Sequence, residues 1–157
     1  MSNKINNNTE KLTSIFSKKH GGNIFVYLEI EDGVVADVSL ELLTKGRTLA
    51  DKQRCKLEAV AVGYQLEKIG EQVFPYGVDT LYLADNERLS PYTTLPHTSI
   101  LVNLFKEKKP QIALMGATSV GRDLGPRVSS ALFSGLTADC TALEIGTYED
   151  KKEKKVY

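Results

Sequence analysis

The chain of 157 residues contains only two cysteines, Cys55 and Cys140, and they lie far apart in the sequence. Two separated cysteines provide neither a disulfide framework nor the CxxC pairs of a zinc knuckle. Free thiols suit a reducing compartment, so we expect a cytoplasmic protein.

The chain also lacks an excess of charge and long apolar runs. Its 20 Lys and Arg residues balance 20 Asp and Glu residues, which excludes a strongly basic nucleic-acid binder and an acidic tail protein. No apolar run approaches the ~18 residues of a membrane-spanning helix. Residues 1–22 are polar and contain no arginine, so neither a secretory signal nor a mitochondrial presequence fits them. We expect a flexible leader there, in which residues 12–16 could form a short helix.

The remaining chain is long enough to bury one core. Along it, segments whose apolar residues are typical of strands alternate with segments whose apolar residues have helical spacing. Alternating strands and helices imply βαβ crossovers, and hence a three-layer α/β fold with a mostly parallel sheet and helices on both faces. The charged segment 150–157 is either a solvated tail or a truncated continuation. Strands are predicted over residues 24–28, 57–62, 80–84, 112–115 and 140–145, and helices over 37–53, 65–76, 96–109 and 119–133.

Two details of the first half are specific enough to test. Asp32 and Gly33 predict a turn. Asp37 or Ser39 could cap the helix predicted over 37–53, whose inner face is expected to carry Val38, Leu42, Gly46, Leu49 and Ala50.

The segment 116–127, GATSVGRDLGPR, is the most informative part of the chain. It follows a predicted strand and opens a helix, the position at which α/β folds bind ligands. Gly116 and Gly121 have the spacing of a Walker loop, but Arg122 and Asp123 replace its Lys-Ser/Thr pair. Two interpretations stay open: a phosphate or nucleotide site, and, with more weight, a strand-to-helix turn whose Arg122 and Asp123 pair with neighbours. Asp139, in the following turn, could also reach a basic partner.

The sequence shows few groups of residues that could act together in catalysis. His20 and His97 have no convincing nucleophile or metal ligand near them in sequence, and no GxSxG elbow indicates a hydrolase. Cys140 opens a predicted buried strand, where a packed thiol is expected rather than a reactive one. We therefore expect no substrate chemistry from this chain alone.

Four segments together resemble the N-terminal domain of electron transfer flavoprotein alpha subunits. The resemblance covers about residues 23 to 145, in order and without large gaps. It implies a Rossmann-like fold of the adenine nucleotide alpha hydrolase-like type, with the family domain over 23–149. The segments are GATSVGRDLGPRV at 116–128, GLTADCT at 135–141, VSLELLTKGRTLAD at 38–51 and YGVDTLYLAD at 76–85.

The resemblance further implies an electron carrier rather than a substrate-transforming enzyme. Members of the family pair with a beta subunit and pass electrons from flavin dehydrogenases to a quinone reductase or another acceptor. The resemblance also implies that FAD is bound in a C-terminal domain, and we expect the main FAD-binding residues to lie outside these 157 residues.

By the same resemblance, the 116–127 loop would contact the beta subunit or lie near a flavin. Arg122 and Arg127 would be the polar anchors, and Asp123 would orient an arginine. Glycines would allow close approach. The alternative is a freestanding module that binds an adenine nucleotide at Gly116–Gly125. The candidate loop residues are Gly116, Thr118, Gly121, Arg122, Asp123 and Arg127.

Overall fold

The computed structural model describes residues 22–146, 149–150 and 155–156. The leader predicted over residues 1–22, except Gly22, lies outside the described residues, as do the short helix around 12–16 and His20. Most of the tail predicted over residues 150–157 also lies outside them.

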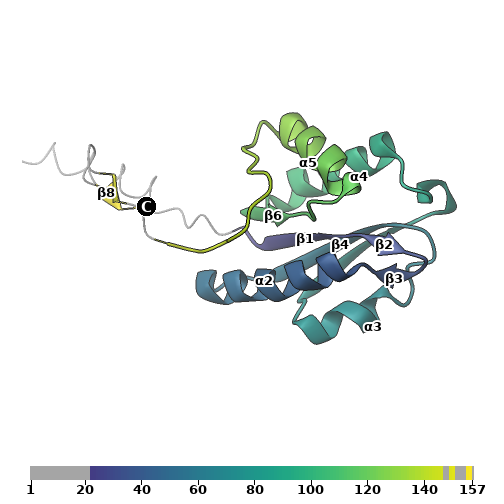
Figure 1. The fold of residues 1–157 in the computed structure, drawn as a ribbon, viewed down its shortest axis with the longest axis horizontal. Coiled ribbons are helices and arrows are strands. Elements are labelled where there is room, and N and C mark those ends of the chain that lie inside the picture. Colours follow the sequence, from purple (N-terminus) through teal and green to yellow (C-terminus); the bar gives the residue numbers. More distant parts are fainter. Residues whose placement is uncertain (1–21, 147–148, 151–154, 157) are drawn as a thin grey trace, which may run out of the picture.

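Four parallel strands form the central sheet (Figure 1). When the strands are numbered along the chain, they lie in the sheet in the order 3-2-1-4. The connection from the third strand to the fourth crosses to the other side of the first strand, so the direction of winding reverses there. The first four predicted strands are confirmed, each within one residue of its expected bounds. They are β1 (Ile24–Leu28), β4 (Leu57–Gly63), β5 (Thr80–Asp85) and β6 (Ile112–Leu114), arranged in the order β5-β4-β1-β6.

Helices cover both faces of this sheet. α2 (Asp37–Gln53) and α3 (Ile69–Val73) lie on one face, and α4 (Thr94–Lys108) and α5 (Ser119–Leu132) lie on the other (Figure 1). β1 is buried throughout, and its side chains alternate between two cores: Val26 packs in the α2 and α3 layer, whereas Phe25 packs in the α4 and α5 layer. The predicted three-layer α/β fold is therefore confirmed.

α2 has the predicted bounds, and Gly46, Leu49 and Ala50 of its expected inner face are buried, but its cap and the first half of its inner face differ from expectation. The N-cap is Ala36, without a side-chain hydrogen bond. Ser39 instead turns inward, where its hydroxyl oxygen accepts a hydrogen bond from the Glu29 backbone N–H at 2.9 Å. Because Ser39 faces the sheet, the buried stripe is displaced, and Val38 and Leu42 are only half-buried. The fully buried residues are Ser39, Leu43, Gly46, Leu49 and Ala50.

A short hairpin leads from β1 into α2. β2 (Ile30–Glu31) and β3 (Val34–Val35) pair antiparallel, and the turn between them places Asp32 at a φ of 50° and Gly33 at 77°. Two successive positive φ angles are typical of tight hairpin turns. The turn predicted at Asp32 and Gly33 is confirmed.

The helix predicted over residues 65–76 is wrong in its first part. The Asp85 carboxylate accepts hydrogen bonds from the backbone N–H groups of Gln65 and Leu66, at 3.0 and 2.8 Å. These bonds stabilise a turn directly after β4, so α3 begins only at Ile69. A 3-10 turn, η1 (Phe74–Tyr76), then continues to Gly77.

The loop between β5 and α4 contains a second 3-10 turn, η2 (Glu87–Leu89). The helices predicted over 96–109 and 119–133 are confirmed as α4 and α5.

The fifth strand, predicted over residues 140–145, is also wrong. This segment has no regular secondary structure, and Cys140 is exposed rather than packed. Leu143 and Ile145 bury their side chains against the core on the α2 side without pairing their backbone with the sheet. β7 (Glu149–Asp150) and β8 (Lys155–Val156) pair only with each other. Within the described part of the chain, none of the helices has the combination of length and apolar character needed to cross a bilayer.

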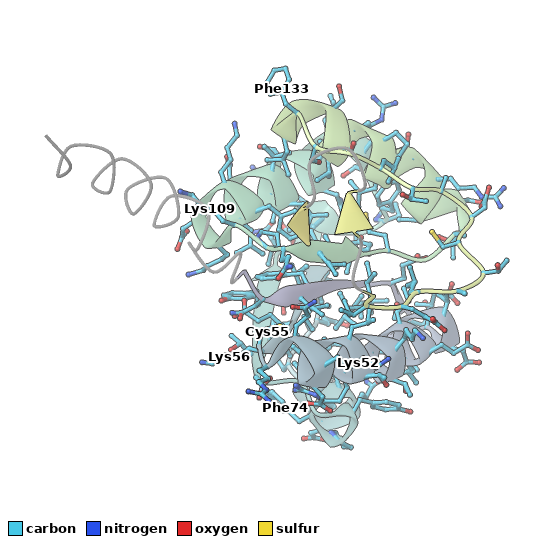
Figure 2. All side chains as sticks on the ribbon, turned by 90° about the vertical axis from the view of Figure 1, so that its left-hand side faces the viewer. Lys52, Cys55, Lys56, Phe74, Lys109 and Phe133 are labelled. Atoms are coloured by element: carbon cyan, nitrogen blue, oxygen red, sulfur yellow. The ribbon has the colours of Figure 1, made fainter. Side chains whose placement is uncertain are left out.

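α5 ends in an unusual way. Phe133 occupies the left-handed C-cap position, with a φ of 52°, and is 99% exposed. Glycine usually occupies this conformation, because a Cβ strains it. The phenyl ring gains no burial that would offset the strain. Figure 2 shows Phe133 standing away from the body of the protein.

We predict that Phe133→Gly raises the free energy of unfolding by about 1 kcal/mol, because glycine relieves the left-handed strain. The matched control is Ala131→Gly, at an exposed position inside α5, which should lower it by roughly 0.5–1 kcal/mol. Urea denaturation followed by circular dichroism measures both changes. A Phe133→Gly variant no more stable than the parent protein would contradict this explanation.

Candidate functional site

The carboxyl ends of β1 and β6 lie side by side where the winding of the sheet reverses. β1 pairs with β6 through Ile24 to Val26, and the turn that follows β6 comes close to Glu29, the residue that follows β1. Open α/β sheets bind ligands at this position. The predicted 116–127 loop therefore occupies the expected place.

Thr118 joins this loop to β1. Its Oγ1 accepts a hydrogen bond from the Gly121 N–H at 3.1 Å, which caps α5, and donates one to Oε1 of Glu29 at 2.8 Å. A Cβ at Gly121 would overlap the carbonyl oxygen of Gly116, and a Cβ at Gly116 would lie 2.8 Å from Oε1 of Glu29. Gly121 is therefore needed for the two backbone segments to pack this closely, whereas a Cβ at Gly116 would require the Glu29 carboxylate to shift.

The Glu29 carboxylate lies at the N-terminus of α5 and is only 8% exposed. The positive end of the helix dipole stabilises a negative charge there. A phosphate-binding helix uses the same position for its ligand. Because an incoming phosphate would meet a like charge in a poorly solvated place, the geometry disfavours a nucleotide at Gly116–Gly125.

Asp123 connects α5 to the loop before α4. Its Oδ2 accepts hydrogen bonds from the hydroxyls of Thr94 and Tyr92, at 2.7 and 2.8 Å, and its Oδ1 accepts one from Nε of Arg127 at 3.0 Å. The hydrogen bonds from Thr94, Tyr92 and Arg127 lower the pKa of Asp123 to about 2.

The two arginines of the loop lie on the exposed side of α5. Arg127 pairs with Asp123 one turn away, and Arg122 pairs with Asp139 at 3.1 Å. Asp139 has a φ of 51°, a conformation typical of turns. It therefore has both roles that the sequence suggested, a turn residue and a partner of a basic side chain. Exposed pairs of this kind contribute about 0–1 kcal/mol and exchange partners readily.

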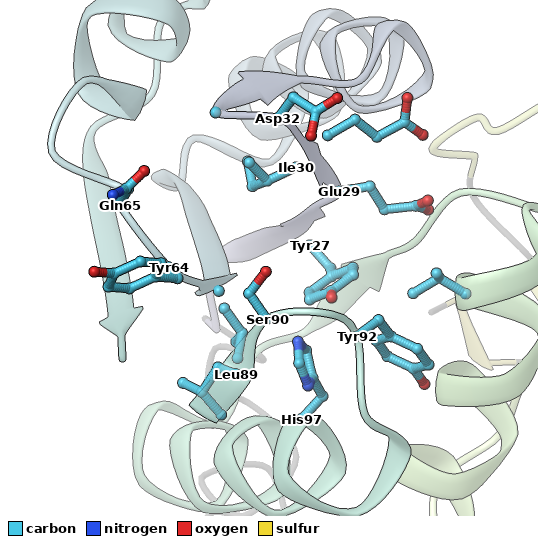
Figure 3. A pocket seen from close by; sticks show the side chains of 15 residues that line it. Tyr27, Glu29, Ile30, Asp32, Tyr64, Gln65, Leu89, Ser90, Tyr92 and His97 are labelled. Carbon is cyan, nitrogen blue, oxygen red and sulfur yellow. The ribbon is translucent and has the colours of Figure 1, made fainter. Parts of the chain in front are cut away.

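A cavity of about 470 Å³ opens at the same edge of the sheet (Figure 3). The β2–β3 hairpin, the end of β4, the loop before α4 and Val120 of α5 line it. Its lining includes the carboxylates of Glu29, Glu31 and Asp32, and none of its lining residues is a lysine or an arginine.

Two buried ring side chains form the floor of this cavity. Burial, followed by the charges of Glu29 and Tyr92, raises the pKa of Tyr27 far above its usual range. Burial lowers the pKa of His97, whose Nδ1 lies 2.8 Å from the Thr93 carbonyl oxygen. Tyr27 and His97 are therefore both neutral near pH 7.

The structure brings together only part of the predicted site. Gly116, Thr118 and Gly121 build the turn between β6 and α5, whereas Arg122 and Arg127 lie on the surface of α5. Sequence analysis missed Glu29, Tyr92 and Tyr27. A charged residue directly at the end of a continuous apolar run is the feature that could have indicated Glu29.

Comparison with known proteins gives consistent matches. The family model described as "Electron transfer flavoprotein domain" matches residues 24–154. The electron transfer flavoprotein subunit alpha of Clostridium acetobutylicum is 43% identical over 122 residues, which cover 78% of this chain and 36% of that protein. Protein FixB of Clostridium saccharobutylicum is 44% identical, with the same coverage of both chains. The acryloyl-CoA reductase electron transfer subunit beta of Anaerotignum propionicum is 40% identical over 78% of this chain and 34% of its own length.

We predict that Gly121→Ala lowers the free energy of unfolding by about 1–3 kcal/mol, the usual range for overpacking. Alanine is the better helix former by about 1 kcal/mol, but the overlap with Gly116 outweighs that gain. Gly135→Ala, where a Cβ would meet no atom within 4 Å, is the matched control and should change stability little. Equal stabilities of the two variants in urea would contradict the close packing at Gly121.

The pKa of Asp123 gives a second test. Because this pKa is lowered from 3.8 to about 2, the hydrogen bonds of its carboxylate stabilise the fold above pH 4, and this contribution is lost as the pH falls towards 2. Tyr92→Phe removes one donor and should raise the pKa of Asp123 measured by carboxyl-carbon NMR titration. Tyr64→Phe, at an exposed tyrosine, should leave it unchanged. A pKa near 4 in the parent protein would refute the described hydrogen bonds.

Proposed function

Because this chain belongs to the electron transfer flavoprotein domain family, we propose that it is the N-terminal domain of an alpha subunit. In this role it pairs with a beta subunit to carry electrons through FAD. The observation that supports the proposal most strongly is the match over residues 24–154, together with relatives of 40–44% identity. The chain spans about a third of the length of these relatives.

The described residues do not fit FAD well. Glu29 places a negative charge at the N-terminus of α5, and the nearby cavity carries three carboxylates. The pyrophosphate of FAD needs backbone N–H groups or cations instead. We therefore infer that residues outside the described domain bind the flavin.

In this proposal the described domain serves subunit assembly. Arg122 and Arg127 lie exposed on one helix, and each is oriented by an aspartate. Arginine is enriched in protein interfaces, and a weak surface pair can be exchanged for a partner's carboxylate. We propose that both arginines contact the beta subunit.

The external partners follow from the same assignment. We propose that flavin dehydrogenases donate the electrons and that a quinone reductase or another acceptor receives them, in a bacterial cytoplasm. Two cysteines, neither in a disulfide, are consistent with a reducing compartment.

Affinity purification of the natural polypeptide that carries this domain, from its source cells, tests the proposal. We expect a beta subunit to co-purify, identified by mass spectrometry, together with about one FAD per alpha–beta pair. Recovery of the polypeptide without beta subunit and without flavin would contradict it.

Substitutions of the two arginines test the proposed interface. In the natural polypeptide, Arg122→Ala and Arg127→Ala should each weaken association with the beta subunit several-fold, and more so at low ionic strength. Arg54→Ala, at an exposed arginine directly after α2 and far along the chain from the loop, is the control and should have no effect. Association constants from analytical ultracentrifugation that are equal for all variants would exclude the loop from the interface.

A further inference from the structure

Tyr27 lines the cavity at the carboxyl end of the sheet and is itself almost completely buried, at 3% exposure. Its hydroxyl has no hydrogen-bond partner among the described residues and is not fully enclosed, since the enclosed unpaired side-chain atoms of that part of the chain are Arg47 Nε and Glu58 Oε2. Figure 3 shows the ring between Glu29, Ser90 and Tyr92, directed into the hollow. A polar group is therefore available to a ligand at the bottom of the cavity.

Glu29 offers a second group to the same space. Its Oε1 accepts the hydrogen bond from Thr118, whereas Oε2 has no partner among the described residues. An ionised carboxylate can accept about four hydrogen bonds, so most of its capacity is unused. A carboxylate that reaches the cavity with one oxygen free of protein partners favours a ligand that carries positive charge and N–H donors.

The rest of the lining has the same preference. Glu31 and Asp32 add negative charge from the hairpin, and no lining residue is basic. Tyr64 and Tyr92 add aromatic rings, on which a planar guanidinium stacks well.

The surroundings indicate a protein as the source of the cation. Tyr64 is 47% exposed at the cavity, so a side chain of another protein can reach it from the surface. Tyrosine is enriched in protein interfaces, which favours a protein partner at this site. A volume of about 470 Å³ holds an arginine side chain and its neighbouring backbone, and ligand sites commonly span about 300–1,000 Å³.

We propose that this cavity binds an arginine side chain presented by a protein partner. Glu29 and Tyr27 accept its N–H groups, and the tyrosine rings pack against the guanidinium. The site does not depend on the assignment of the chain to an alpha subunit, because the preference follows from the lining alone.

The experiment is an NMR titration of the 157-residue chain with N-acetyl-arginine amide. We expect saturable shifts at Tyr27, Gly63 and Tyr64. The neutral isostere N-acetyl-citrulline amide, which has the same shape, should bind at least tenfold more weakly, because a hydrogen bond to a charged group contributes about a tenfold effect or more. Equal binding of the two probes, or no saturable binding of the arginine probe, would overturn the proposal.

Variants locate the site. Glu29→Gln keeps an acceptor for Thr118 and removes the charge, and it should weaken binding of the arginine probe about tenfold. Asp32→Asn, at an exposed turn position that asparagine tolerates, should also weaken binding and serves if Glu29→Gln does not fold. Glu67→Gln, an exposed glutamate outside the lining, is the control and should bind as the parent does. Unchanged binding in both cavity variants would overturn the assignment, and tight binding of free agmatine without binding of the arginine amide would assign the cavity to a small metabolite instead of a protein.

Discussion

The hydrogen bond between Thr118 and Glu29 connects the two strands at which the winding of the sheet reverses. The two residues are separated by 89 positions in the chain, and their oxygens lie 2.8 Å apart. Next to this bond Gly121 must lack a side chain, since its Cβ would overlap the carbonyl oxygen of Gly116, and a Cβ at Gly116 would displace the Glu29 carboxylate. The backbone N–H of Glu29 in turn holds Ser39, which fixes the start of α2. Glu29 is thus hydrogen-bonded through its side chain to the N-cap of α5 on one face of the sheet and through its backbone to α2 on the other.

The same carboxylate changes what the fold can bind. Doubly wound sheets commonly hold nucleotides where the winding reverses, with phosphate at a helix N-terminus. Here Glu29 supplies the negative charge from within the chain, and the adjacent cavity is acidic. We therefore propose that this Rossmann-like topology serves contact with other chains and that residues outside the described ones bind the flavin.

The sequence predicts α2 and the first four strands well, because continuous apolar runs and helical spacing reflect burial directly. It fails where a distant residue decides the local structure. Asp85 takes the backbone N–H groups of Gln65 and Leu66, which delays α3, and residues 140–145 bury Leu143 and Ile145 without a strand partner. In the site, the glycines of the 116–127 loop stand out by spacing alone. Glu29 stands out only as a charged residue at the end of an apolar run, and that position does not indicate a contact 89 residues away.

The most direct test of this account is calorimetric titration of the 157-residue chain with AMP, ATP and NADH. The Glu29 carboxylate at the N-terminus of α5 predicts no saturable heat with any of the three, because each would bring a phosphate to a position that is already negative. Saturable binding of one nucleotide per chain, abolished by Thr118→Ala, would contradict the account. It would show that the loop after β6 is a nucleotide site after all.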